Sequence, residues 1–397
     1  MSERSPHVPA DRVVSFDPYR DPDQAADPFS VFEQFRGKPL LWSGRYGGFW
    51  IATSAEIVRA VYQDPELFSS RLTGIPAGTF WPRPLIPLEL DPPEHRKYRK
   101  VLVQPFSARS VSRYEEPMRA ACTEIVSELV PRGGCEFVTE VAHRFPTLVF
   151  IDQLFGFPRE RADDFVRWNF TLLHGATVAE RSAQSDQLIA FLESAIDERG
   201  TSPEGHDILS HLLRSSVDDH KLTREEVLDT AFLLFLAGLD TVATAMSFAF
   251  HYLAGHPDER NALIADPSVI PAAVDELLRY HAFVSNTRTV TRDTEFYGVE
   301  LRAGDRMHLP APVAGRDPDE FDEPQSVTFA RKPNRHMTFG LGPHRCIGIH
   351  LAKLELEVAL RVWHDFIPDY DLPPLDPPSF RAGTILGIEK LPIVWGR

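Results

Sequence analysis

Apolar residues recur every three or four positions through most of the middle of the chain, which is the period of an α-helix with one buried face. The pattern is clearest in residues 120–129, 187–196 and 227–253. With loops marked by Pro or Gly, it extends over about residues 94–280, and a further helical run covers 347–366. The spacing therefore predicts a mainly α protein with a large helical domain.

Alternating patterns rich in β-branched and aromatic residues gather in three separate places. They lie at about residues 38–70, where a glycine-rich stretch predicts a β-hairpin, at 285–310 and at 380–397. No linker long enough to divide domains occurs between them and the helical segments. We therefore expect one domain over residues 1–397, with a small β-rich region beside the helical one.

Two local signals predict where helices begin. Asp27 followed by Pro28 is typical of an N-cap and first helical residue, and predicts a short helix ending near residue 35. Thr223 and Glu226 have the spacing of a capping box, so they are expected to open the long central helix.

Charge and cysteine content narrow the function classes. The net charge is −15, with 57 acids against 42 bases, which argues against nucleic acid as a partner because phosphate binding needs a basic surface. Three cysteines are too few and odd in number for a disulfide framework. The first twelve residues lack an apolar run, so no signal peptide or anchor is expected. These features predict a cytoplasmic protein.

Residues 231–255 are apolar enough and long enough to span a bilayer. Asp240 lies in the middle of this stretch, and an acid there costs ~2.5–3.5 kcal/mol on insertion scales. A helix buried in a soluble core is therefore the better interpretation, and we expect no membrane partner.

The long irregular segment 312–343 ends in a distinctive run, Phe339-Gly340-Leu341-Gly342-Pro343-His344-Arg345-Cys346-Ile347-Gly348, and a helix is predicted directly after it. The positive end of the helix dipole favours a thiolate at Cys346, which is the form that binds a metal. Glycines before it let the backbone approach a flat ligand closely. Taken alone, a single cysteine is more often a small buried hydrophobe.

The ten-residue run resembles the haem-binding signature of the cytochrome P450 family. It matches at six positions: Phe339, Gly340, Gly342, His344, Cys346 and Gly348. The resemblance implies the cytochrome P450 fold, with haem b (iron protoporphyrin IX) between the central helix and the cysteine loop and Cys346 as the axial iron ligand. The overall spacing is similar to that of bacterial camphor-type monooxygenases.

Glu276 and Arg279 resemble the Glu-x-x-Arg pair of this family, on one helix face, and Arg331 resembles its third partner. In the family this triad holds the long loop under the haem, which is a structural role. The alternative is a surface ion pair of little energetic value.

Ala237, Gly238, Asp240 and Thr241 match the segment where the family's central helix opens beside the oxygen site. The resemblance implies that Ala237 and Gly238 contact the cofactor, that Thr241 bonds dioxygen or a water, and that Asp240 supplies protons. The alternative is an acid and an alcohol that merely face a polar pocket between helices.

His95 and Arg99 lie four residues apart on a predicted helix and resemble the family's propionate-binding residues, as do Arg288 and His344. Four basic groups would neutralise two carboxylates that are costly to bury. Each of them alone is more often a solvated base.

The segment 72–90 corresponds to the family's substrate-covering loop and is apolar, which favours a small apolar, terpenoid-like substrate. It contains no tyrosine to anchor a camphor-like ketone, and Arg83 stands near that point, so a carboxylic acid anchored by Arg83 is the alternative. Core packing is the alternative role of every apolar candidate. The substrate candidates are Phe80, Trp81, Arg83, Leu85, Leu233, Leu236, Val284 and Ile385.

The expected activity is hydroxylation with dioxygen and electrons from a two-iron ferredoxin and its NAD(P)H-dependent reductase, by a monomer. No dinucleotide fingerprint follows a predicted strand, so the electrons must come from separate proteins. Exposed bases are expected to form the ferredoxin docking patch, although a solvated surface is their default role. Its predicted members are Arg96, Lys97, Arg99, Lys100, Arg331, Lys332, Arg335 and Arg345.

Three alternatives to this activity stay open. One is a peroxide-using or reductive haem-thiolate enzyme, which needs no acid and alcohol pair of the Asp240 and Thr241 kind. Another is a haem-binding sensor or carrier without turnover, and the remotest is a purely structural helical protein.

Overall fold

The computed structural model describes residues 6–21, 27–71, 74–75, 85–175, 177–200 and 204–396. Contacts divide the chain into two compact units. The sheet unit comprises Met1–Thr79, Pro271–Cys346 and Pro378–Lys390, and the helical unit comprises Phe80–Ile270, Ile347–Pro377 and Leu391–Arg397. Each unit is described separately below.

A mixed six-stranded sheet organises the sheet unit. Its strands, in spatial order, are β1 (Val13–Val14), β2 (Leu40–Ser43), β3 (Phe49–Ala52), β11 (Arg306–Pro310), β8 (Ser285–Val290) and β4 (Phe68–Ser69). The predicted hairpin is confirmed, since β2 and β3 pair antiparallel with Trp42 opposite Trp50. β11 then runs parallel to β3 and antiparallel to β8. Two regions far apart in sequence thus share one sheet.

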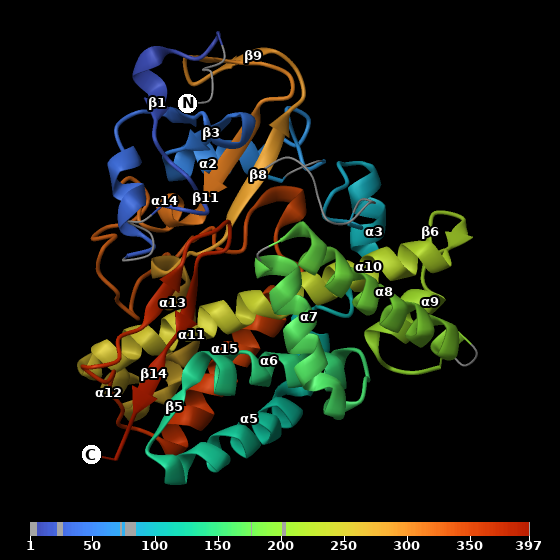
Figure 1. The fold of residues 1–397 in the computed structure, drawn as a ribbon, viewed down its shortest axis with the longest axis vertical. Coiled ribbons are helices and arrows are strands. Elements are labelled where there is room, and N and C mark those ends of the chain that lie inside the picture. Colours follow the sequence, from blue (N-terminus) through green and yellow to red (C-terminus); the bar gives the residue numbers. More distant parts are fainter. Residues whose placement is uncertain are drawn as a thin grey trace. The chain divides into compact units, whose positions relative to one another are not determined.

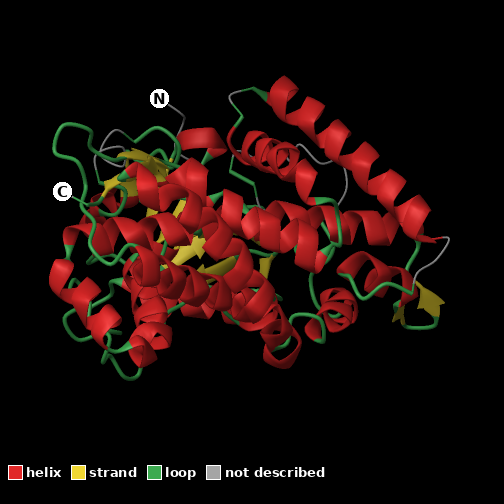
Figure 2. Cartoon of the chain, turned by 90° about the horizontal axis from the view of Figure 1, so that it is seen from below, coloured by secondary structure: helices red, strands yellow, loops and turns green. Residues whose placement is uncertain are grey.

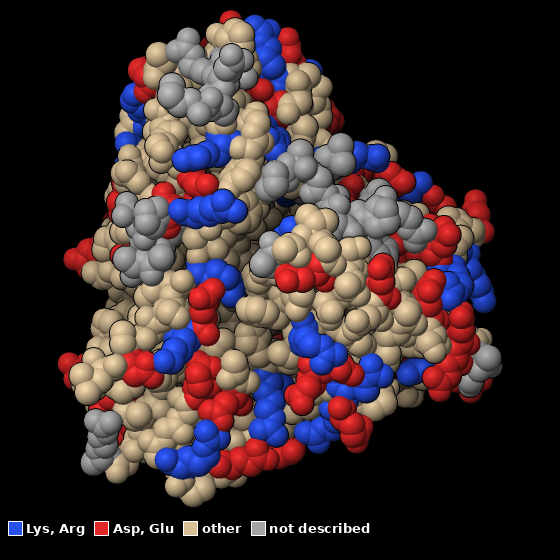
Figure 3. Space-filling model, viewed as in Figure 1, with Lys and Arg blue, Asp and Glu red and all other residues tan. Residues whose placement is uncertain are grey.

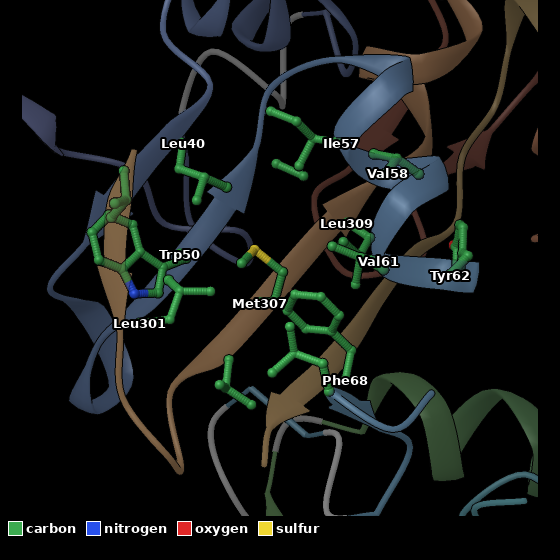
Figure 4. Close-up of a cluster of buried hydrophobic side chains, with 14 of the residues drawn as sticks. Leu40, Trp50, Ile57, Val58, Val61, Tyr62, Phe68, Leu301, Met307 and Leu309 are labelled. Atoms are coloured by element: carbon green, nitrogen blue, oxygen red, sulfur yellow. The ribbon is translucent and has the colours of Figure 1, made fainter. Parts of the chain in front are cut away.

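Helix α2 (Ala55–Gln63) supplies apolar side chains to the core of this sheet. Its first turn is capped by the Ser54 hydroxyl, which accepts the N–H of Ile57. Figure 4 shows Val61 of α2 directed toward Leu309 of β11, with Met307 of the same strand beside Phe68. All four of these side chains are buried.

The remaining elements of the sheet unit are short. They are β9 (Thr294–Phe296) paired with β10 (Val299–Leu301), β12 (Ser379–Arg381) paired with β13 (Gly387–Lys390), the helices α13 (Ile270–Tyr280) and α14 (Ala311–Gly315), and the 3₁₀-helices η1 (Ala10–Arg12), η2 (Ser30–Phe35), η3 (Arg45–Gly47) and η10 (Gly342–His344). The C-terminal β pattern therefore does not join the main sheet within this unit.

The short helix predicted at Asp27 and Pro28 is wrong in type and start. The structure has a 3₁₀-helix that begins at Ser30, and the Asp27 carboxylate accepts the N–H of Phe29 at 3.0 Å. A side chain that bonds the N–H two residues on forms a local turn, which delays the helix.

The helical unit carries the long periodic segments, and helices dominate the view in Figure 2. Its α-helices are α3 (Glu94–Val103), α4 (Ala108–Val111), α5 (Glu115–Leu129), α6 (Arg144–Leu148), α7 (Ala162–His174), α8 (Val178–Gly200), α9 (Ile208–Arg214), α10 (Arg224–Gly238), α11 (Asp240–Gly255), α12 (Pro257–Ala265) and α15 (Ile349–Phe366). Helix α15 packs along α5 and also contacts α11, and α5 and α15 can be followed in Figure 1.

Shorter elements complete the helical unit. They are the π-helices η6 (Val138–Ala142) and η7 (Val149–Leu154), the 3₁₀-helices η4 (Ser112–Tyr114), η5 (Val130–Arg132), η8 (Arg159–Arg161) and η9 (Pro267–Val269), the pair β5 (Gly134–Glu136) and β14 (Pro392–Val394), and the pair β6 (Ser216–Val217) and β7 (His220–Lys221). The predicted capping box is confirmed, because the Thr223 hydroxyl and the Glu226 carboxylate each accept the other residue's N–H.

Within the described residues, one helical stretch, Arg224–Gly255, is long and apolar enough to cross a membrane by length and composition alone. Most of its apolar window, 78%, is buried. Core helices of soluble proteins pass the same test, so this stretch is weak support for a membrane span.

Candidate active site

The cysteine loop folds back on itself at the end of the sheet unit. The N–H of Cys346 donates to the carbonyl of Phe339 at 2.8 Å, and the N–H of Gly340 donates to Met337 at the same distance. Cys346 lies two residues before Gly348, the N-cap of α15. Cys346 therefore comes just before a helix in the chain, as the spacing predicted.

The three thiols differ sharply in environment. Burial raises the pKa of Cys122 to about 12 and that of Cys135 to about 12, so both stay protonated at neutral pH. Cys346 is exposed. It is therefore the one cysteine of this chain whose environment suits a thiolate ligand.

Two glycines shape the cysteine loop, and both have φ of +67°. A Cβ at Gly342 would lie 2.3 Å from the carbonyl oxygen of Tyr62, whereas a Cβ at Gly340 would meet nothing closer than 3.9 Å. Close approach to a flat ligand was the expected reason for these glycines. For Gly342 the structure gives another reason, which is contact with the end of α2.

Glu276, on α13, gathers the predicted triad into one buried cluster. Its carboxylate accepts two bonds from Arg279, at 2.8 and 2.9 Å, and two from Nε of Arg331, at 2.9 and 3.0 Å. The surface ion-pair alternative does not hold, since Glu276 and Arg279 are fully buried. Although burial raises the pKa of Glu276, the hydrogen bonds and charges of its partners lower it on balance.

The two arginines of this cluster also hold the long loop. Arg279 donates to the carbonyls of Gly315, Pro324 and Ser326, each at 2.8 Å. Arg331 donates to the carbonyl of Asp322 at 2.6 Å. Carbonyls of an irregular segment, which has no ladder of its own, thereby gain charged donors.

A single residue separates the end of α10 from the start of α11, so the predicted central helix is interrupted. Leu239 stands at the break with φ −101° and ψ −65°. The Thr241 hydroxyl donates to the carbonyl of Ala237 at 2.8 Å. A Cβ at Gly238 would lie 2.6 Å from the ring of Phe150 on η7, so this glycine also makes room for an aromatic neighbour.

Asp240 opens α11 and is fully buried. Its Oδ2 lies 3.1 Å from Nε2 of His174, the last residue of α7, which makes an ion pair when the imidazole is protonated. Sequence reasoning missed His174. No local pattern links it to Asp240, since the two residues belong to helices far apart in the chain.

The four predicted propionate ligands divide between the units. In the helical unit, His95 is buried and Arg99 half-buried on α3. In the sheet unit, Arg288 of β8 is buried, with its guanidinium carbon 5.5 Å from the centre of the Tyr62 ring, and His344 is half-buried in η10.

The predicted substrate residues are also spread over the chain. Phe80, Trp81 and Arg83 lie outside the described residues. In the sheet unit, Val284 and Ile385 form an antiparallel bridge, and both side chains are half-buried. In the helical unit, Leu85 and Leu233 are buried and Leu236 is half-buried; the last two lie on α10.

These donors fit a haem better than a metal held by protein side chains. Among the described residues, no group of three or more His, Cys, Asp or Glu side chains has metal-binding geometry. A haem iron needs one axial side chain, for which a thiolate is suited, and Cys346 is an exposed thiol. In each unit taken by itself, the predicted propionate ligands are basic side chains, the type that binds carboxylates.

Comparison with known proteins decides the family. The cytochrome P450 family model matches residues 134–363. A probable cytochrome P450 127A1 of Sinorhizobium fredii is 34% identical, over 98% of this chain and 96% of that protein. The chain is a cytochrome P450. It belongs to the oxidoreductases, its cofactor is haem b, and its fold is the cytochrome P450 fold.

This cytochrome P450 is also similar to several other members of the family. A pentalenic acid synthase of Streptomyces avermitilis is 32% identical over 98% of this chain and 96% of that protein, and a steroid C26-monooxygenase of Mycolicibacterium smegmatis is 32% identical over 88% of each. The crystal structures of CYP101J2 and CYP101C1 each superpose with a TM-score of 0.92 at 32% identity, covering both chains fully. They support the predicted likeness to camphor-type monooxygenases.

Proposed function

We propose that this cytochrome P450 hydroxylates a small apolar, terpenoid-like molecule with dioxygen and electrons from a ferredoxin system. The observation that carries the proposal is the acid and alcohol side by side at the interrupted helix, Asp240 and Thr241. Bound haem supplies the iron centre at which dioxygen is activated. Cys346 is proposed as the iron ligand, with Gly348 beside it and Phe339, Gly340 and Ala237 against the haem.

In this proposal, the side chains of the protein deliver the protons that the reaction needs. The Thr241 hydroxyl donates to the carbonyl of Ala237, which leaves its oxygen able to accept a hydrogen bond from dioxygen or a water. Asp240 is buried next to it and paired with His174. A carboxylate and a hydroxyl in this order can pass protons inward, which a peroxide-using enzyme does not require.

The proton relay is tested by Thr241→Ala. We expect product formed per NAD(P)H consumed to fall at least about tenfold, with hydrogen peroxide released instead. Thr244→Ala removes a buried threonine of the same helix and is the matched control. Unchanged coupling in Thr241→Ala, together with product formation from peroxide alone, favours the peroxide-using alternative.

The substrate class rests on the apolar character of the described candidates, Leu85, Leu233, Leu236, Val284 and Ile385. One relative is named as a steroid C26-monooxygenase, so apolar substrates occur in the family. We expect terpenoids to shift the haem absorption band in a ligand screen. Shifts with carboxylic acids alone, abolished in Arg83→Leu, favour the acid anchored by Arg83.

We propose that the chain works in the cytoplasm as a monomer and receives electrons from a two-iron ferredoxin. Exposed Arg96 and Lys100 on α3 are the basis for the docking surface, beside a cavity of about 690 Å³. Arg331 was predicted to belong to this surface, but it is largely buried and bound to Glu276. The cavity is lined by Arg96, Lys97, Lys100, Val101, Gln104, His211, Ser215, Ser216, Val217 and Asp218.

Ligation by Cys346 has its own test. The reduced, carbon-monoxide-treated holoprotein is expected to show the red-shifted thiolate band, and Cys346→Ser is expected to lose it. Cys122→Ser is the control, because that thiol is buried and protonated. A normal band in Cys346→Ser contradicts the assignment, and a normal band without turnover of any substrate favours the carrier alternative.

A further inference from the structure

Side chains donate hydrogen bonds to the backbone carbonyls at the end of α10. An α-helix leaves the carbonyls of its last turn without N–H partners from its own residues, and in α10 these carbonyls belong to residues 235–238. Ala237 accepts the Thr241 hydroxyl. Phe235 and Leu236 both accept the side-chain amide of Asn169, at 3.1 and 3.3 Å. Three of the four carbonyls are thus bound by side chains.

Asn169 is suited to this position by its chemistry. It lies on α7 and is 2% exposed, and its amide nitrogen carries two N–H donors, one for each carbonyl. The same helix ends at His174, which pairs with Asp240 on the other side of the break. Helix α7 therefore contacts both α10 and α11 at the interruption.

In a continuous helix these carbonyls would have backbone partners. The N–H of Leu239 would bond Phe235, that of Asp240 would bond Leu236, and the N–H of Thr241 would compete with its own hydroxyl for Ala237. The Asn169 amide takes the place of two of these donors. It thereby offsets the cost of leaving the helix open in a buried environment.

We propose that Asn169 is a positioning residue that holds the central helix open and so sets the places of Asp240 and Thr241. This inference rests on the proposed proton relay. Asn169 touches neither substrate nor haem in this account, and it acts through the carbonyls that it binds. Loss of its donors lets the helix close over Leu239 and moves the acid and the hydroxyl out of register.

Asn169→Leu tests the inference in the holoprotein, because leucine has a similar size and no donor. Hydrogen exchange of the amides in residues 239–242 is expected to slow as the helix closes. Product per NAD(P)H is expected to fall at least about fivefold, while the substrate Kd from the haem absorption band stays within about twofold. Asn169→Gln keeps both donors and is expected to recover most of the loss.

Controls separate this inference from the proposed function. Leu172→Val loosens the packing of the same buried helix face without touching the carbonyls, and should leave exchange at residues 239–242 unchanged. Unchanged exchange in Asn169→Leu overturns the inference. So does full coupling in Asn169→Leu when Thr241→Ala is uncoupled. If Thr241→Ala itself stays coupled, the proposed proton relay is wrong. Slowed hydrogen exchange in Asn169→Leu, reversed in Asn169→Gln, would still support the proposal that Asn169 holds the helix open.

Discussion

At the scale of single residues, the carboxylate of Glu276 on α13 binds four partners, three of which lie outside its own helix. It accepts from Arg279 and Arg331, from the backbone N–H of Thr328 at 3.0 Å and from the amide of Asn334 at 3.1 Å. Removing its charge leaves the fully buried Arg279 guanidinium without an anion. Such losses are costly because a buried charge has no water to replace its partner.

Glu276→Gln is therefore expected to lower the free energy of unfolding by about 3 kcal/mol or more. Chemical denaturation at pH 7 measures this change. Glu300→Gln is the control, because that exposed pair with Arg302 is worth at most about 1 kcal/mol. Equal losses in the two variants would contradict a special role for the buried cluster.

The pH dependence of this effect follows from the lowered pKa of Glu276. A carboxylate with a folded pKa below its ordinary value of 4.5 stabilises the protein fully above that value, and the contribution is lost as pH falls through the folded pKa. The difference between wild type and Glu276→Gln should therefore shrink below about pH 5.

Residue contacts were predictable where the partners are local. Glu276 and Arg279 lie three apart on one helix, and the resemblance to the family's Glu-x-x-Arg pair together with this spacing predicted their contact. The contacts of His174 with Asp240, and of Asn169 with α10, were not predictable. They join helices distant in sequence, and a histidine or asparagine in a helix gives no signal of its partner.

At the scale of elements, the cysteine loop is shaped by two glycines with the same φ and different surroundings. Alanine at either position is strained by about 1–2 kcal/mol, because a Cβ disfavours the left-handed region. At Gly342 the added Cβ would also meet the Tyr62 carbonyl at 2.3 Å, whereas at Gly340 its nearest neighbour would be the Tyr62 ring at 3.9 Å, an ordinary van der Waals contact. The two positions thus separate backbone strain from collision.

Gly342→Ala is expected to lose more stability and more bound haem than Gly340→Ala. Thermal unfolding and the haem content per protein, measured side by side, give the comparison. Gly340→Ala serves as the control for strain alone. Equal behaviour of the two variants would mean that contact between α2 and the loop is unimportant.

Helix α15 contains a buried acid that its neighbours do not neutralise. Glu355 is 2% exposed, and its Oε2 has no hydrogen-bond partner among the described residues. Burial raises the pKa of Glu355 well above its ordinary value. The folded protein therefore favours the protonated form, and ionisation at higher pH destabilises it.

Glu355→Gln is expected to gain stability over wild type as pH rises from about 5 to 9, by up to about 1.4 kcal/mol per pH unit inside the titration window. Melting temperatures of both proteins across this range measure the gain. Glu389→Gln, an exposed acid of β13, is the control. Parallel curves for wild type and Glu355→Gln would show that burial does not raise the pKa of Glu355 in the folded protein.

Most elements followed from hydrophobic period, but the break at Leu239 did not. The apolar pattern continues through α10 and α11, and periodicity cannot show where backbone bonds are replaced by side-chain donors. The mispredicted start at Asp27 has a similar cause, since its side chain bonds a nearby N–H. Side-chain bonds to the backbone are the common reason for both failures, and they are local at Asp27 but come largely from the distant Asn169 at the break.

At the scale of the whole molecule, the net charge is strongly negative, but exposed basic residues occur locally. The chain carries a net charge of −15, and on the face in Figure 3 basic and acidic side chains are interspersed. The net negative charge repels an acidic ferredoxin, which therefore needs a local basic surface on which to dock. Arg96 and Lys100, one turn apart on α3, are exposed and are the residues proposed to form such a surface in the helical unit.

If α3 docks the ferredoxin, reduction of the wild type should slow as ionic strength rises, because screening weakens attraction between exposed charges. The double variant Arg96→Glu, Lys100→Glu is expected to be reduced about tenfold more slowly at low salt and to lose the salt dependence. Stopped-flow reduction over a range of salt concentrations measures both. Arg159→Glu, Arg167→Glu reverses the same charge at exposed, paired arginines elsewhere in the helical unit and separates docking from net charge. Equal slowing by the two double variants would leave only the overall field, and α3 would have no special part in electron transfer.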